Sequence, residues 1–309
     1  MDLPEDYADD RLAFVEGAPA TMTSSMHRDL EHGNRLEVGL VGATGPVASV
    51  LATVDVAAWD ALAVAAGLPL VRLIGAAPRP IPAYNSNGLG LVAPSAAAEE
   101  AVELLEEGFT AVKLRLGRPS AADDLAAVRA VREAAGPQYT VMADFNQALS
   151  LPEARSRCRL LDDEGLMWIE EPIRRDDYAG SAELAAAMNT PVQIGENFAG
   201  PRALAAATAA RASNLVMPDL DRIGGVTGWM AAAAIADAAG IPMSSHLYPE
   251  ASAHLLAATP TAHWLEYVDR ANPVLAEPPL VVDGAMRVPE QAGSGVRWDE
   301  KAVSHYHLG

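Results

Sequence analysis

Polar side chains that could bind a metal ion or transfer a proton close a series of short apolar runs in this chain. Each run ends in one such residue, and a stretch of helical composition follows in most cases. The six residues are Asp144, Glu170, Glu196, Asp219, His246 and Glu266. The carboxyl ends of the strands in a β/α barrel meet at one mouth, so this repeated pattern predicts that the six side chains converge there.

The first three carboxylates, Asp144, Glu170 and Glu196, end successive predicted strands. Any one of them could be a solvated loop acid or a helix N-cap, but three in succession are hard to explain in that way. Carboxylates brought together cannot all stay ionised without a cation, and oxygen-only ligands suit a hard ion. The trio therefore predicts a Mg²⁺ site. Glu171 follows directly, so strand alternation places it on the opposite face, where we interpret it as structural.

Asp219 and His246 end the next two predicted strands. A carboxylate beside an imidazole fixes the tautomer of the ring and raises its basicity, which predicts a general base. A histidine in an SSHLY run is by itself more often a packed or loop residue, but its place beside the metal trio favours catalysis. Glu266 ends the last strand, and a carboxyl in a crowded acidic site can be held protonated and donate a hydrogen bond.

Cationic and small polar residues complete the predicted site. Lys113 and Arg115 alternate along one strand, so they share a face, either at the barrel mouth or on a surface edge. At the mouth they could hold an acidic substrate. Ser86 and Asn146 are candidate polar contacts with that substrate.

The bulk composition limits the class of protein. Of the 309 residues 50% are apolar and 20% charged, as in a soluble globular chain. The net charge of -19 would repel nucleic acid and an anionic membrane, so neither is an expected partner. The one cysteine, Cys158, excludes an internal disulfide and is interpreted as a packing residue. Since the acidic N-terminus has no signal-peptide pattern, we expect a cytoplasmic protein.

Strand and helix patterns alternate from about residue 80 onward, at intervals of roughly 20 to 30 residues. Strands are predicted at 82–87, 110–116, 139–145, 166–171, 191–196, 214–219, 241–247 and 263–268. Helices are predicted at 50–66, 120–136, 151–165, 181–189, 200–211 and 225–240. The strands are short and apolar throughout, as expected of parallel strands buried on both faces, so the pattern predicts an α/β barrel.

The chain divides into three predicted regions. Residues 1–78 would form a partial, mainly helical N-terminal capping region, with a possible strand pair around 35–42. Residues 79–270 would form the barrel. Residues 271–309 contain an Asp-Gly turn between alternating residues, which predicts a hairpin outside the barrel, in a segment that returns to the capping region.

The motifs at these positions resemble the enolase superfamily, and within it the mandelate racemase and muconate lactonizing enzyme group. The similarity runs from about residue 55 to the C-terminus. It is carried by AAWDAL, VKLRLG, MADFNQ, WIEEP, QIGEN, MPDLDRIGGVTGW and SSHLYPEASAHLLAATPTAHWLE. It implies a modified (β/α)₇β TIM-type barrel with Mg²⁺ bound to Asp144, Glu170 and Glu196.

The resemblance also implies roles for the remaining residues. Lys113 and Glu266 would hold the substrate carboxylate, and Ser86 would assist them. Asn146 would contact the substrate near the metal ion.

The proposed proton carriers depart from the group's pattern. The resemblance implies that Asp219 and His246 act as one acid/base, whereas racemases of the group place a second base, a lysine, where Arg115 stands. A guanidinium stays protonated at working pH, so it cannot readily abstract a proton. We keep Arg115 among the candidate catalytic residues, but a one-base route through His246 is the one that survives.

A second departure lies at the N-terminus. The family carries an α+β capping domain whose three-stranded sheet closes over the substrate, and this sequence resembles only the helical part of that domain. A fragment, a misassigned gene start or a more open mouth would each explain the difference.

These observations predict a Mg²⁺-dependent enzyme that removes the α-proton of a small carboxylic acid through an enediolate. With arginine at the second base position, dehydration of a sugar acid or related α-hydroxy acid is the favoured reaction. A mandelate racemase-like racemase or epimerase is the alternative, and a metal-binding but catalytically silent barrel is a third reading. Enzymes of this architecture are often assemblies, so we expect a homo-oligomer.

Overall fold

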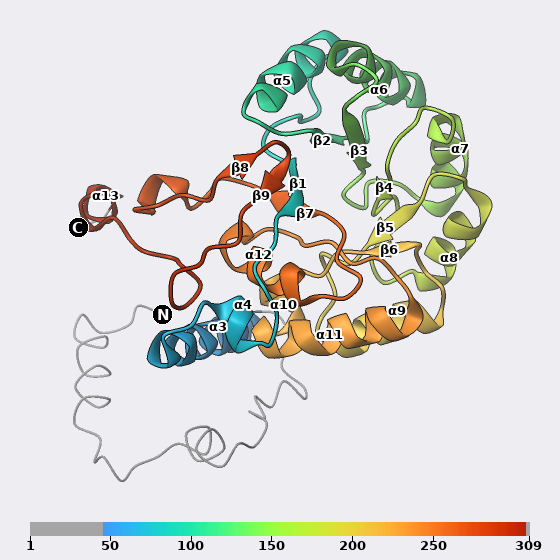
Figure 1. The fold of residues 1–309 in the computed structure, drawn as a ribbon. Coiled ribbons are helices and arrows are strands. Elements are labelled where there is room, and N and C mark those ends of the chain that lie inside the picture. Colours follow the sequence, from blue (N-terminus) through green and yellow to red (C-terminus); the bar gives the residue numbers. More distant parts are fainter. Residues whose placement is uncertain (1–45, 307–309) are drawn as a thin grey trace, which may run out of the picture. The chain divides into compact units, whose positions relative to one another are not determined.

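The computed structural model describes residues 46–306, which belong to one compact unit, Ala43–Gly309. Its central feature is a closed ring of parallel strands surrounded by helices (Figure 1). The strand pair predicted around 35–42 lies outside the described residues.

The barrel is built from strands joined in chain order. These are β1 (Ile81–Asn85), β2 (Ala111–Arg115), β3 (Thr140–Asp144), β4 (Ile169–Glu170), β5 (Val192–Ile194) and β6 (Leu215–Val216). Parallel bridges from Val216 to Met243 and from Met243 to Ala262 continue the ring. β7 (Leu265–Tyr267) then pairs with β1 and closes it. All eight predicted strand positions take part in this ring, so the predicted barrel is confirmed.

Helices follow the strands and form the outer layer. They are α5 (Pro94–Glu106), α6 (Ala121–Ala135), α7 (Leu151–Leu161), α8 (Tyr178–Ala187), α9 (Pro201–Ala209), α10 (Leu220–Ile223), α11 (Gly225–Ala239) and α12 (Pro249–Ala258). Local signals set their ends. Ser120 caps α6 by accepting a hydrogen bond from the Asp123 amide, and Gly136 ends the same helix with φ 92°. The helices predicted at 120–136, 151–165, 181–189, 200–211 and 225–240 are confirmed.

Apolar side chains pack on both sides of the strands. The larger cluster fills the space between strands and helices and includes Cys158, which is buried as predicted. The smaller one lies inside the barrel and comprises Tyr84, Ala111, Met142, Trp168 and Leu215. Four of these five residues lie two positions before a predicted site residue on the same strand. Since alternate residues face the same side of a strand, this inner cluster forms the floor beneath the mouth.

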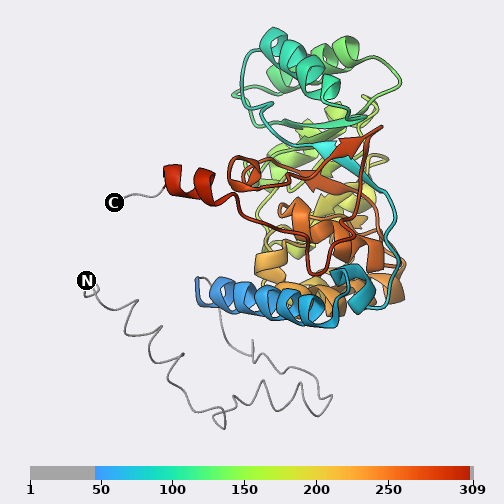
Figure 2. The same ribbon diagram turned by 60° about the vertical axis from the view of Figure 1, so that its left-hand side comes forward.

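The regions before and after the barrel lie against it. Helix α3 (Pro46–Ala66) covers the predicted helix at 50–66 and packs against α10 and α11 (Figure 2). Its length and apolar composition alone would allow it to cross a membrane, but core helices of soluble proteins can have the same length and composition. The short helix α4 (Leu70–Leu73) follows.

The C-terminal segment begins with the 3₁₀ helix η1 (Asn272–Val274) and ends with α13 (Glu300–Tyr306). Between them, β8 (Val281–Val282) and β9 (Ala285–Met286) form the predicted hairpin around Asp283 and Gly284. β9 adds to β1 in antiparallel direction. Backbone hydrogen bonds then join Gly293 to Leu68 and Leu70, next to α4. Domain boundaries at residues 78 and 270 stay a prediction.

Candidate active site

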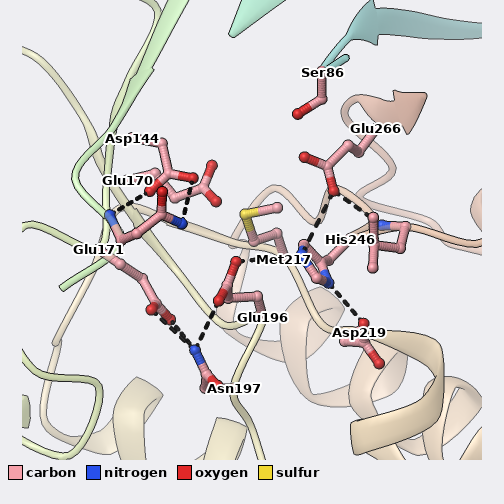
Figure 3. Close-up of polar contacts among 12 residues, drawn as sticks. Ser86, Asp144, Glu170, Glu171, Glu196, Asn197, Met217, Asp219, His246 and Glu266 are labelled. Carbon is pink, nitrogen blue, oxygen red and sulfur yellow. Dashed lines mark hydrogen bonds and ion pairs between the residues drawn. The ribbon is translucent and has the colours of Figure 1, made fainter. Parts of the chain in front are cut away.

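The predicted metal ligands meet at the carboxyl ends of their strands. Asp144 and Glu170 are the last residues of β3 and β4, and Glu196 lies two residues after β5. One carboxylate oxygen from each lies within 4.8 Å of the other two. Asp144 and Glu170 are buried, whereas the Glu196 side chain is 15% exposed. Figure 3 shows Asp144 and Glu170 on one side of the mouth and His246 and Glu266 on the other, with Glu196 between them.

This donor set fits a Mg²⁺ ion. Octahedral Mg²⁺ holds oxygens at about 2.0–2.1 Å, so neighbouring ligand oxygens are about 2.9 Å apart and opposite ones about 4 Å apart. The oxygens of the trio lie within 4.8 Å of one another, which is close to this range. The charge balance points the same way, because the mouth holds more carboxylates than cationic groups. Burial and the neighbouring Asp144 carboxylate raise the pKa of Glu170 well above its usual value, which indicates that a further cation would be favourable here.

Lys113 is the cation at the centre of this cluster. Its Nζ lies 2.9 Å from Oε1 of Glu170, 2.8 Å from Oε1 of Glu266 and 3.4 Å from Oδ2 of Asp144. The side chain is 1% exposed. Burial lowers the pKa of Lys113, but the Glu170 and Glu266 carboxylates outweigh burial and raise it well above its ordinary value. The ammonium group is therefore a fixed positive charge in the mouth.

Arg115 lies on the same face of β2, as strand alternation predicts, but closer to solvent, with 25% of its side chain exposed. Its Nη1 lies 3.2 Å from Oδ2 of Asp144, and its Nη2 donates to Oγ of Ser86 at 3.2 Å. Burial lowers the pKa of Arg115, but the Asp144 carboxylate and its acidic neighbours outweigh burial, so this pKa lies above its ordinary value. Arg115 thus stays protonated and cannot act as a second base.

Asn146 orients one of the predicted metal ligands. Its backbone amide donates to Oδ1 of Asp144 at 2.7 Å, and its side-chain amide donates to Oδ2 at 3.1 Å. The residue has φ 45°, which directs both donors back toward the strand end. Whether it also contacts substrate stays a prediction.

His246 and Asp219 form the predicted dyad. Nδ1 of His246 lies 2.6 Å from Oδ2 of Asp219, so Nε2 faces the mouth, 3.2 Å from Oε2 of Glu196 and 3.7 Å from Oε2 of Glu266. Burial lowers the pKa of His246, but Glu266, Asp219 and Glu196 together raise it to about 10. The other carboxylate oxygen of Asp219 accepts from the backbone amides of Asp221 and Arg222 in α10, so the dyad is anchored to a helix.

Glu266 differs from its predicted state. It lies between the ammonium of Lys113 and the imidazole of His246, and one of its oxygens accepts from the Leu247 amide at 3.0 Å. Burial raises the pKa of Glu266, but Lys113 and His246 outweigh it and hold this pKa well below the ordinary value. The Glu266 carboxyl is therefore ionised here, whereas the pKa of Glu170, which shares Lys113 with it, is raised.

Glu171 also differs from its predicted place. β4 ends at Glu170, and Glu171 has φ 36°, so strand alternation no longer sets its direction. Its carboxylate instead accepts a hydrogen bond at 3.0 Å from the side-chain amide of Asn197, which also donates to Glu196 at 2.9 Å. Burial, followed by repulsion from Glu196, raises the pKa of Glu171 to about 7. It belongs to the edge of the site (Figure 3).

Sequence reasoning missed three residues that contact the site. Trp168 donates from Nε1 to Oε2 of Glu170 at 3.2 Å, and its position two residues earlier in the predicted strand 166–171 could have indicated this. Asn197 contacts Glu196 from the loop after β5 and Arg222 from the single turn of α10, and no periodic signal marks either residue.

Comparison with known proteins agrees with this geometry. Residues 96–302 match the family described as enolase C-terminal domain-like. The chain belongs to this family. It is 34% identical over 263 residues to an L-talarate/galactarate dehydratase of Salmonella typhimurium, and the match covers 85% of this chain and 66% of the dehydratase. The chain thus spans slightly less than two thirds of that relative's length.

Two solved structures are similar over most of the chain. One is an enolase from the alpha proteobacterium BAL199 with bound Mg, at 48% identity and a TM-score of 0.85, covering 90% of this chain and 78% of that one. The other is an enolase from Bradyrhizobium complexed with magnesium and mandelic acid, at 42% identity and a TM-score of 0.81, covering 91% and 76%. The resemblance to the enolase superfamily is thereby confirmed.

Proposed function

We propose that this protein is a Mg²⁺-dependent enzyme that removes the α-proton of a small carboxylic acid, and that it dehydrates a sugar acid or related α-hydroxy acid. The observation that carries the proposal is that the His246 imidazole contacts the carboxylate trio, while Arg115, at the other candidate base position, stays protonated and cannot serve as a second base. The relatives support it, since one is a sugar acid dehydratase and another binds magnesium and an α-hydroxy acid.

Each side chain has a proposed role. Asp144, Glu170 and Glu196 would hold the ion, which when bound would acidify the α-proton by drawing charge onto the substrate carboxylate. Lys113 and Glu266 would position that carboxylate. A preorganised charge such as the Lys113 ammonium is typically worth about 10² to 10³ in rate.

Two other side chains would complete the substrate contacts. Ser86 would hydrogen-bond the carboxylate, with its hydroxyl oriented by the guanidinium of Arg115. Asn146 would contact the substrate next to the metal ion.

His246 would carry the proton at Nε2, while Asp219 fixes Nδ1 as the hydrogen-bonded nitrogen. Glu196 is one of the carboxylates that raise the pKa of His246 to about 10, and a metal ion bound to Glu196 would offset that effect, so that the imidazole is neutral before it takes the proton. In the dehydration, the α-C–H bond breaks and its proton goes to Nε2. The electron pair forms the C=C bond of an enol as the β-C–O bond breaks, and the leaving hydroxide takes the proton from His246 as water. The enol then tautomerises to the 2-keto acid. One imidazole can do both steps when hydrogen and hydroxyl leave from the same side.

The test is solvent deuterium exchange at the α-carbon, followed by NMR with a panel of aldonic, aldaric and hydroxy acids and Mg²⁺. We expect exchange and a 2-keto acid product for at least one sugar acid. His246→Asn should lower both rates by about 10² to 10⁴, the usual contribution of a general acid/base.

The control and the alternatives use the same samples. His305→Asn, at an exposed position on α13, should leave both rates unchanged. Formation of the opposite stereoisomer without water loss would support a racemase instead. No exchange with any acid, in a protein that binds Mg²⁺, would support a catalytically silent barrel, and full activity in His246→Asn would overturn the proposed base.

The proposed function also leads to proposals on the oligomeric state, location and partners of the protein. We infer a homo-oligomer located in the cytoplasm, with a small carboxylic acid as its partner and neither nucleic acid nor a membrane. Size-exclusion chromatography with light scattering tests the oligomer.

A further inference from the structure

We propose that Asn197 is a positioning residue that holds the Glu196 carboxylate in place for the metal ion, and that Arg222 fixes Asn197 in turn. This inference rests on the proposed metal site. Asn197 lies in the loop that follows β5, next to Glu196, and its side chain also reaches Glu171, which follows β4 (Figure 3).

Asn197 uses its full hydrogen-bonding capacity. Its Nδ2 donates to Oε2 of Glu171 at 3.0 Å and to Oε1 of Glu196 at 2.9 Å. Its Oδ1 accepts from Nη1 of Arg222 at 2.8 Å and from Nη1 of Arg175 at 3.1 Å. Only an amide offers two donors and an acceptor for two bonds within one planar group. A flipped amide would place its oxygen against two carboxylates and its NH₂ against two guanidinium groups, so the network selects one orientation.

Glu171 and Glu196 would otherwise repel each other. A carboxylate free to move away from its neighbour would not stay aimed at the other two ligands, Asp144 and Glu170. Because Asn197 donates one N–H to each acid, it fixes their separation, while Oε2 of Glu196 faces the mouth, 3.2 Å from Nε2 of His246. Groups that orient a metal ligand in this way typically contribute about 10- to 100-fold to metal affinity.

Arg222 connects this loop to the catalytic dyad. Its Nη1 also donates to the backbone oxygen of Glu196 at 2.9 Å, so it contacts both the ligand's backbone and the amide that aims its side chain. Arg222 belongs to the short helix α10, and Asp219 caps that helix while it bonds His246. One turn of helix thus orients both a metal ligand and the proposed base.

The experiment measures Mg²⁺ affinity by isothermal titration calorimetry and stability by thermal unfolding in EDTA, on the full chain. Asn197→Leu keeps the side-chain shape and charge but removes all four hydrogen bonds. Asn214→Leu is the matched control, since Asn214 bonds the Val192 amide at the opposite end of β5. Arg222→Met and the double variant with Asn197→Leu complete a double-mutant cycle.

We expect Asn197→Leu to raise the Mg²⁺ dissociation constant about 10- to 100-fold. Asn214→Leu should leave it unchanged even if its melting temperature falls. If Arg222 acts through Asn197, Arg222→Met will weaken binding, and the double variant will bind no more weakly than Asn197→Leu alone. Should Asn197→Leu fail to fold, Arg222→Met provides the same comparison of affinity with stability.

Two results would overturn the inference. One is a dissociation constant within twofold of the parent in the folded Asn197→Leu variant, or in Arg222→Met if the former does not fold. The other is a double variant whose loss of Mg²⁺ binding free energy equals the sum of the losses in Asn197→Leu and Arg222→Met. A parent protein that binds no Mg²⁺ would overturn the proposed function as well, so the two failures are distinguishable.

Discussion

Lys113→Met removes the buried ammonium group that offsets part of the negative charge of the mouth. The three carboxylates of Asp144, Glu170 and Glu266 lie within 3.4 Å of Nζ and are each at most 1% exposed. Removing one partner of a buried ion pair typically costs 3–5 kcal/mol because the remaining charge is left uncompensated. We expect a loss of about 3–5 kcal/mol in the free energy of unfolding in EDTA.

Mg²⁺ should reduce the difference in the free energy of unfolding between the parent and Lys113→Met, since a divalent cation at the trio supplies positive charge near the position of the missing ammonium. A ligand at 100 times its dissociation constant stabilises the native state by about 2.7 kcal/mol. We expect the gain from Mg²⁺ to be larger in Lys113→Met than in the parent, because the variant lacks the ammonium that repels the ion.

Urea unfolding with EDTA and with Mg²⁺ measures both effects. Lys301→Met, at an exposed position on α13, is the control and should change the free energy by less than about 0.5 kcal/mol. If Lys113→Met were as stable in EDTA as Lys301→Met, the ammonium would not be the group that compensates the buried carboxylates, and the reasoning would be refuted.

Two further predictions concern groups outside the mouth. Burial raises the pKa of the Cys158 thiol to about 12, so a thiol reagent at about pH 8 should label the protein only after denaturation, and rapid labelling of the native chain would contradict the packing. Burial also lowers the pKa of His254 below 6.5, although the Ser294 carbonyl raises it. The unfolded chain therefore binds a proton there that the folded chain rejects, and stability is lost as pH falls below 6.5. His254→Gln should show a shallower loss in urea unfolding between about pH 7.5 and 5.5, and equal slopes would exclude this role.

The barrel and most of the site could be predicted from the sequence because the residues that carry the chemistry lie at or just after the ends of apolar runs. Asp144, Glu170 and Asp219 follow buried runs, and the closed ring brings such ends together. Periodicity also placed Lys113 and Arg115 on one face. These predictions depend on strand alternation, which is a property of regular backbone and can be read without knowing the tertiary contacts.

The prediction failed where the backbone leaves the strand. Glu171 has a positive φ, so alternation gave the wrong face. Asn197 and Arg222 lie in a loop and a single helical turn, and their contacts join residues 25 positions apart. The ionised state of Glu266 depends on how close Lys113 comes, which spacing along the chain does not specify.

Positive φ angles at non-glycine residues recur around this mouth, at Asn146, Glu171, Leu247 and Tyr248. Such conformations cost about 1–3 kcal/mol each where the surrounding contacts must hold them. At two of them the strained residue turns a backbone amide onto a site carboxylate, from Asn146 to Asp144 and from Leu247 to Glu266. The strain thus falls where donors orient acids that would otherwise repel one another. These two amides add to the Lys113 ammonium in stabilising Asp144 and Glu266 as neighbouring negative charges, at the cost of the strained backbone that presents them.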